Sequence, residues 1–153
     1  MVSSETKRIL IISLQGIGNT LLFTPALRAL EERYPQADIY SLVLTGGERD
    51  TLAQNRYIRD IIIINEGRYQ GLIGKLRLIW DLRKKHIDLA ITAYPGGLKT
   101  ATISLLSGAR CRIGHILPRS NPLPRWCFSK CYHIALQGSP DKHDIDNNFD
   151  LLS

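Results

Sequence analysis

The sequence predicts an α/β domain in which helices cover both faces of a parallel sheet. Short aliphatic runs alternate with segments of helical periodicity along nearly the whole chain, which is typical of strands joined by crossover helices. The aliphatic runs do not alternate regularly with polar residues, as expected for strands that are buried on both faces. A glycine-rich loop follows the first run, where such folds commonly bind ligands. This arrangement is Rossmann-like.

The first two elements are predicted to be a strand and a helix joined by that loop. Residues 7–14 form a short aliphatic run that predicts the strand. Asn19 or Thr20 can cap the following helix, and Pro35 ends it. From Leu21 onward, apolar residues recur at helical spacing, with charged residues on the opposite side: Phe23, Ala26, Leu27, Leu30 and Tyr34.

The same alternation continues through the middle of the chain. Strands are predicted at residues 37–45, 60–65 and 87–94, with a helix near residues 48–56 between the first two. A longer helix is predicted across residues 71–86, where lysines and arginines face outward. Its apolar face is expected to consist of Leu72, Ile73, Leu76, Ile79 and Trp80.

The last third of the chain continues the pattern and contains one long connection. Short strands are predicted at residues 111–116 and 131–136, and a final helix begins near residues 139–141. The connection over residues 117–129 is long and rich in proline, as is common for lids, binding segments and disordered loops. A helix closed by Gly108 precedes these strands, and its predicted apolar face consists of Leu98, Ala101, Thr102, Leu105 and Leu106.

Length and composition indicate one ordinary globular domain. The chain has 153 residues, of which 44% are hydrophobic and 22% are charged. Three cysteines and no secretory signal make reduced thiols the expectation. The longest aliphatic run, residues 61–64, is far shorter than the ~20 residues of a membrane-spanning helix. The composition therefore predicts a soluble, intracellular domain.

The net charge of +6 favours anionic partners such as phosphorylated sugars, nucleotides, nucleic acid or a membrane surface. No pattern of a known nucleic-acid-binding module is present, so nucleic acid is not an expected partner. A solvated surface explains the same charge equally well. The bases concentrate in residues 108–130, a stretch without any acid, as Arg110, Arg112, Arg119, Arg125 and Lys130.

The loop at residues 15–20 is the best local candidate for a binding site. Gly16 and Gly18 let the backbone approach a ligand closely, and the helix that follows favours an anion at its N-terminus. A dinucleotide fingerprint would have a third glycine at Leu21 and an acid after the second strand, and this chain has neither. A nicotinamide-dependent oxidoreductase is thus disfavoured, and a tight strand-to-helix turn is the alternative interpretation of the glycines.

Metal and nucleophile patterns are weak. Cys127 and Cys131 lie near His133, but no second pair of ligands follows, so no metal site is predicted. His115 follows a strand on the expected ligand side and is a candidate base, and His143 can cap the last helix or contact a ligand.

Residues 8–43 closely resemble the opening of glycosyltransferase family nine, the ADP-heptose:lipopolysaccharide heptosyltransferase family. The segment contains an aliphatic strand, a loop with Gly-Asn, the pattern Thr-Pro-x-Leu-x-x-Leu, then Tyr-Pro and a second strand. Three later segments are also similar to the family: IDLAITAY, SGARCRIGH and the ending HDIDNNFDLL, which follows a His-x-x-x-x-Asn-x-x-Leu pattern. The resemblance covers nearly the whole chain in order.

This resemblance implies a GT-B architecture, in which two Rossmann-like domains face each other across a cleft. Residues 1–153 would be the N-terminal, acceptor-binding domain, and the C-terminal donor-binding domain would be absent from the chain. The implied reaction transfers a sugar, a heptose in the family, from a nucleotide-sugar such as ADP-heptose to a lipopolysaccharide or related glycan. No separate cofactor is implied. The implied location is the cytoplasm, with peripheral contact at the inner face of the membrane.

The resemblance also implies site residues. Gly16, Gly18 and Asn19 would line the acceptor side of the cleft, and Arg119 and Arg125 would hold phosphates or carboxylates of an anionic, glycan or lipid-linked acceptor. Asn19 stands where the lipopolysaccharide heptosyltransferases place an aspartate that acts as general base. An amide cannot take a proton at working pH, although it can hold a hydroxyl.

Three functions therefore remain open at the level of sequence. The first is the acceptor half of a glycosyltransferase. The second is a non-catalytic module that binds acidic glycan or lipid, and the third is an unrelated nucleotide-binding Rossmann domain.

Overall fold

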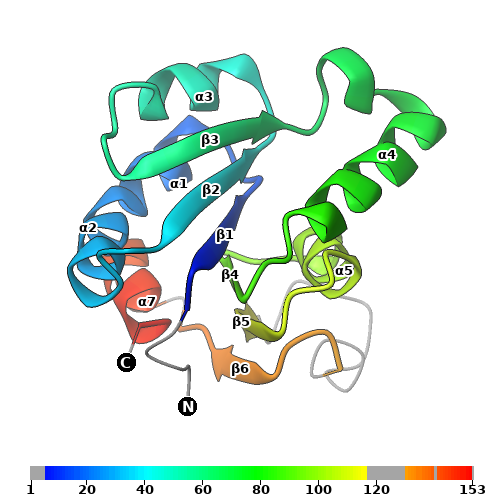
Figure 1. The fold of residues 1–153 in the computed structure, drawn as a ribbon. Coiled ribbons are helices and arrows are strands. Elements are labelled where there is room, and N and C mark those ends of the chain that lie inside the picture. The colour runs from blue at the N-terminus through cyan, green and yellow to red at the C-terminus, as the bar shows by residue number, and fades with distance from the viewer. Residues whose placement is uncertain (1–5, 117–129, 140, 153) are drawn as a thin grey trace.

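The computed structural model describes residues 6–116, 130–139 and 141–152, and contains a six-stranded, all-parallel sheet. The strands lie in the order β3-β2-β1-β4-β5-β6, so the chain starts in the middle of the sheet and builds outward in both directions (Figure 1). The predicted α/β fold class is confirmed. The strand bounds are β1 Arg8–Ser13, β2 Asp38–Val43, β3 Ile58–Ile63, β4 Leu89–Thr92, β5 Cys111–Ile116 and β6 Ile134–Gln137.

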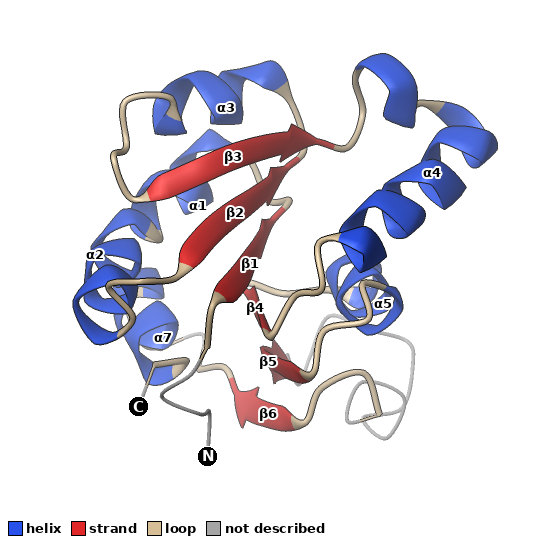
Figure 2. Ribbon diagram, viewed as in Figure 1, coloured by secondary structure: helices blue, strands red, loops and turns tan. Residues whose placement is uncertain are grey.

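Helices cover both faces of the sheet (Figure 2). One face packs against α1 (Ile17–Leu22), α2 (Thr24–Arg33), α3 (Gly46–Leu52) and α7 (Asp144–Asp150). The other face packs against α4 (Gly71–Lys84) and α5 (Leu98–Leu106). A short 3₁₀ turn, η1 (Gly67–Tyr69), precedes α4. Because β1 is covered on both sides, its apolar residues are 0–1% exposed, which explains why its sequence has no polar alternation.

The carboxyl ends of the strands meet at one edge of the sheet. Ile12 of β1 is in register with Leu42 of β2 and with Thr92 of β4, and Val43 is in register with Ile63 of β3. The loops that follow β1, β2, β3 and β4 therefore emerge side by side, which is the arrangement that forms ligand sites in open parallel sheets.

The first helix begins earlier than predicted. Gly16 adopts φ 96°, a conformation that favours glycine, and the helix starts at the next residue, without any side-chain cap. Asn19 thus lies inside the first turn of α1, and the expected capping role of Asn19 or Thr20 is wrong. Pro25 cannot donate to Leu21, and the Thr24 hydroxyl donates to the Leu21 carbonyl instead at 2.6 Å, where α1 gives way to α2.

The longest helix is present where predicted, but it turns a different face to the sheet. Gly74, Leu78 and Leu82 form the buried stripe of α4. At Gly74 the helix approaches η1 so closely that a Cβ atom would lie 2.3 Å from the carbonyl carbon of Tyr69. The side chains expected in the core are instead largely exposed, namely Leu72, Ile73, Leu76 and Trp80.

The predicted apolar face of α5 is wrong except at Ala101, which is buried. Leu98, Leu105 and Leu106 are exposed, whereas the buried side chains of this helix are Thr100, Ala101, Ile103 and Ser104. The predicted closure at Gly108 is confirmed by its φ of 77°. Within the described ranges, no helix is both long and apolar enough to cross a bilayer.

Candidate functional site

Residues 15–19 lie at the carboxyl end of β1, beside the loop that precedes α5, and comprise the end of the β1 loop and the first turn of α1. A Cβ atom added at Gly16 or Gly18 would meet no atom within 4 Å among the described residues, so the backbone here borders open space. Asn19 is half-buried, and its Nδ2 donates to the Gln15 carbonyl at 3.2 Å. Among the described residues, its Oδ1 accepts no hydrogen bond. The three predicted residues therefore lie together at the expected edge, Gly16 in the loop and Gly18 and Asn19 in the first turn of α1.

A buried carboxylate holds this loop in place. Glu48 is 0% exposed, and its Oε1 accepts from the Gly16 backbone N–H at 2.8 Å. Its Oε2 accepts from the backbone N–H groups of Leu44 and Thr45 at 2.7 and 2.8 Å. One side chain of α3 thereby links the β1 and β2 loops. Since the Gly16 N–H is already bonded, an anion cannot use that donor, and Gly16 contributes shape instead of a hydrogen bond.

Glu48 was not identified from the sequence, although a signal existed. Thr45 followed three residues later by a glutamate is the capping-box pattern of a helix start. The pattern predicts the bond to the Thr45 backbone, but not the bond to Gly16.

A second carboxylate extends the network to the third loop. Glu66 follows β3, and its Oε1 accepts from the Gly46 backbone N–H at 2.8 Å. Gly46 and Gly47 leave room for neighbours, because Cβ atoms there would lie 3.2 Å from Glu66 Oε1 and 3.0 Å from Ile17 Cδ1. The loops after β1, β2 and β3 are thus tied together by hydrogen bonds and close packing, which limits their movement around the open glycines.

The loop after β4 is anchored from α7. The backbone N–H of Tyr94 donates to Oδ1 of Asn148 at 2.8 Å, and the Tyr94–Pro95 peptide bond is cis. Asn147 holds the segment before the helix, since its Oδ1 accepts from Ser139 N at 3.1 Å and its Nδ2 donates to Ser139 O at 3.0 Å. Both asparagines are fully buried. His143 caps the helix, because its Nδ1 accepts from Ile145 N at 3.3 Å.

His115, the candidate base, is buried in the structure. It is 2% exposed, and its ring forms a T-shaped pair with the Tyr94 ring, with the ring centroids 5.2 Å apart. Burial lowers the pKa of His115 to about 4, Asp150 partly opposes that change, and Lys142 adds to it. His115 is therefore neutral at pH 7. Its position gives it no access to an acceptor hydroxyl.

The burial of His115 predicts a pH-dependent stability. A histidine with a folded pKa near 4 and an unfolded pKa near 6.5 favours folding above pH 6.5, and that contribution is lost as the pH falls from 6.5 to 4. The loss should reach about 3 kcal/mol of unfolding free energy, measured by urea denaturation at each pH. His115→Leu should flatten this part of the profile. An identical profile in the variant would show that another group causes the loss.

The two arginines predicted to bind the acceptor cannot be located in the site. Arg119 and Arg125 lie outside the described residues, as does the long connection of residues 117–129. In the parts of the chain that the structure describes, no group of three or more His, Cys, Asp and Glu side chains has a geometry that could hold a metal ion.

Searches against protein-family models and against curated proteins found no significant match. Solved structures do match. The glycosyltransferase family 9 protein from Veillonella parvula DSM 2008 aligns over 95% of this chain and 40% of its own, with a TM-score of 0.77 and 19% identity. E. coli heptosyltransferase WaaC with ADP aligns over 94% of this chain and 45% of its own, with a TM-score of 0.69 and 19% identity.

A second WaaC structure, with ADP-2-deoxy-2-fluoro heptose, gives a TM-score of 0.72 at 19% identity over 94% of this chain and 46% of its own. The chain thus has the Rossmann-like fold of part of these GT-B glycosyltransferases and spans less than half of their length. These structural matches confirm, at the level of the fold, the family resemblance that residues 8–43 indicate.

Proposed function

We propose that this chain is the acceptor-binding half of a glycosyltransferase that acts in the synthesis of lipopolysaccharide or a related glycan. The observation that carries the proposal is the shared fold over 94–95% of the chain. The names of two matching structures include ADP or a fluorinated ADP-heptose, which supports a nucleotide-sugar, and specifically ADP-heptose, as the donor. That donor would bind mainly to a second domain, and no other cofactor is proposed.

The proposed chemistry moves the sugar from the nucleotide to an acceptor hydroxyl. The hydroxyl oxygen forms a bond to the anomeric carbon, the bond to the nucleotide diphosphate breaks, and the hydroxyl proton goes to a base. Gly16 and Gly18 leave the space in which the acceptor would lie. Asn19 Oδ1 accepts a hydrogen bond from the hydroxyl and orients it. The proton must go to another group, because an amide cannot take it.

The charge of the chain supports an anionic acceptor at a membrane. Arg119 and Arg125 are proposed to bind its phosphates or carboxylates, since guanidinium groups form paired hydrogen bonds with such anions. A net charge of +6 would draw the chain to the anionic cytoplasmic surface of a membrane. The proposed location is accordingly cytoplasmic and peripheral to the membrane.

A non-catalytic binding module is the second candidate, and the environment of Asn19 favours it. The carboxylate closest along the hydrogen-bond network, Glu48, is fully buried and bonded to three backbone donors, so it cannot replace the missing base. A module would bind the same acceptor and transfer nothing.

The test of the acceptor-half assignment is calorimetry with ADP and ADP-heptose. The 153-residue chain should bind neither more tightly than about millimolar, which corresponds to roughly −4 kcal/mol. E. coli WaaC, measured in the same way, is the positive control. Micromolar binding by this chain would overturn the assignment and favour the nucleotide-binding Rossmann domain instead.

A further inference from the structure

The outward face of α4 carries an unusual set of apolar side chains. Leu72, Ile73, Leu76 and Trp80 are 79%, 76%, 66% and 62% exposed. Leu72, Leu76 and Trp80 are spaced four residues apart, so they line one stripe of the helix. An apolar stripe of this size on the solvent-exposed side of a helix is typical of a surface that binds another molecule.

The stripe continues into a groove between α4 and α5. The groove has a volume of about 560 Å³, and its lining includes Ile79, Leu98, Ile103 and Leu106. Leu98, Leu105 and Leu106 are themselves 44%, 41% and 39% exposed. We call the exposed side chains of α4 and α5 together with this groove the α4–α5 face.

Positive charge surrounds the α4–α5 face. Lys75, Arg77, Arg83 and Lys84 belong to α4, and Lys99 belongs to α5. The Nζ atom of Lys84 lies 5.2 Å from the centroid of the Trp80 ring, so a cation and an aromatic ring stand together on the exposed side.

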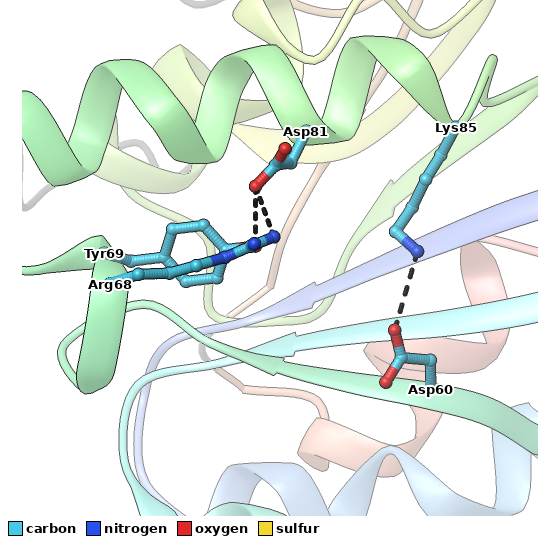
Figure 3. Close-up of polar contacts among 5 residues, drawn as sticks. All are labelled: Asp60, Arg68, Tyr69, Asp81 and Lys85. Carbon is cyan, nitrogen blue, oxygen red and sulfur yellow. Dashed lines mark hydrogen bonds and ion pairs between the residues drawn. The ribbon is translucent and has the colours of Figure 1, made fainter.

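The negative charge of these helices is neutralised away from the face. Asp81 is the one acid in their sequences, and its Oδ2 lies 2.6 Å from the Arg68 guanidinium and 2.9 Å from the Tyr69 hydroxyl (Figure 3). At the end of α4, Lys85 turns back to Asp60 of β3 at 3.5 Å (Figure 3). Lys75 is half-buried, and its Nζ donates to the Ile64 carbonyl at 2.6 Å. The exposed bases are Arg77, Arg83, Lys84 and Lys99, and no acid on their own helices is left to balance them.

We propose that the α4–α5 face docks on an anionic lipid bilayer. Leucine and tryptophan on one helical face beside lysine and arginine are typical of helices that lie in a membrane interface. Anionic headgroups complement the surrounding bases, at distances where each base adds to the attraction. A second copy of the chain fits poorly, because a two-fold contact would set these bases against the same bases of the partner.

The docking orientation would bring the candidate site to the membrane. Leu72 lies in the first turn of α4 and Leu98 begins α5, so both lie at the carboxyl edge of the sheet that also carries the loop with Asn19. This consequence rests on the proposed function, in which the acceptor is carried on a lipid. The docking itself does not depend on the proposed function, because binding to a bilayer can be measured without donor or acceptor.

The experiment is sedimentation of the chain with vesicles of phosphatidylglycerol and phosphatidylethanolamine, compared with vesicles of phosphatidylcholine. Binding should be clear on the anionic vesicles and weak on the neutral ones. The double variant Leu76→Ala/Trp80→Ala should bind the anionic vesicles about a hundredfold more weakly, because two large apolar side chains no longer enter the interface. Arg77→Gln/Lys84→Gln should weaken binding roughly tenfold or more and reduce its salt dependence.

Matched controls lie on the opposite side of the sheet. Leu21 of α1 and Phe149 of α7 are 49% and 40% exposed, and their replacement by alanine should leave vesicle binding unchanged. Because all these positions are exposed, the thermal unfolding of every variant should remain close to that of the unchanged chain. In a Trp126→Phe background, Trp80 is the sole tryptophan, and its fluorescence should shift to the blue on anionic vesicles.

Three results would overturn the proposal. The first is that the chain fails to bind anionic vesicles. The second is that it binds them equally well after Leu76→Ala/Trp80→Ala. The third is that the same substitutions abolish a dimer seen by analytical ultracentrifugation. The last result would identify a second copy as the occupant. None of these outcomes changes nucleotide-sugar binding, so they are distinguishable from a failure of the proposed function.

Discussion

Replacing Glu48 with alanine should lower the free energy of unfolding by about 3 kcal/mol or more. The substitution leaves the backbone N–H groups of Gly16, Leu44 and Thr45 without their partner. Each unpaired buried donor costs about 1–3 kcal/mol, and entry of water into the vacated space recovers only part of that loss. The measurement is urea denaturation followed by circular dichroism, with the slope of the transition compared between variants.

Two further variants make this measurement decisive. Glu48→Gln keeps one accepting oxygen and should cost roughly half as much, because its amide nitrogen cannot accept a hydrogen bond. Glu32→Ala removes an exposed carboxylate that pairs with Arg28 at 3.0 Å, and it should cost less than about 1 kcal/mol. If Glu48→Ala cost no more than Glu32→Ala, the network that joins the β1 and β2 loops would not exist in solution.

The central strands β1, β2 and β4 were predictable because strands buried on both faces are apolar along most of their length. An apolar run such as that of β1 needs no knowledge of its neighbours to be recognised. The faces of α4 were not predictable in this way, since the helix carries two apolar stripes. The buried stripe contains Leu78 and Leu82, which pack in the core on one face of the sheet, and the packing of helix on sheet is a property of the fold and not of the helix alone.

The position of the candidate site in the fold was predictable, but the hydrogen bonds that hold its loops were not. The alternation of strands and helices places residues 15–19 at the carboxyl edge, and the structure places Gly16, Gly18 and Asn19 there. The contacts that fix the loops join residues far apart in the chain. Glu48 reaches back 32 residues to Gly16, and Asn148 reaches back 54 residues to Tyr94. Local patterns do not identify such partners.

In a two-domain protein that contains this chain, Asn19→Asp should raise the rate of sugar transfer by about 10²–10⁴-fold. By the family resemblance, a carboxylate at this position would supply the general base, and general-base assistance is typically worth that factor. The gain should be present near pH 7 and fade as the pH falls through about 4, because only the deprotonated carboxylate accepts the proton. The measurement is the initial rate of nucleotide release across that pH range.

The structure separates this effect from a change in folding. Residue 19 lies in the first turn of α1, where a carboxylate is favoured by the helix dipole, while the bond from Nδ2 to the Gln15 carbonyl is lost. These contributions oppose each other, so the unfolding free energy should change by less than about 1 kcal/mol. Asn19→Ala is the control, and it should weaken acceptor binding without creating a base. An active parent enzyme whose rate is unchanged by Asn19→Asp would show that this side chain does not face the reacting hydroxyl. The acceptor would then have to bind elsewhere along the carboxyl edge.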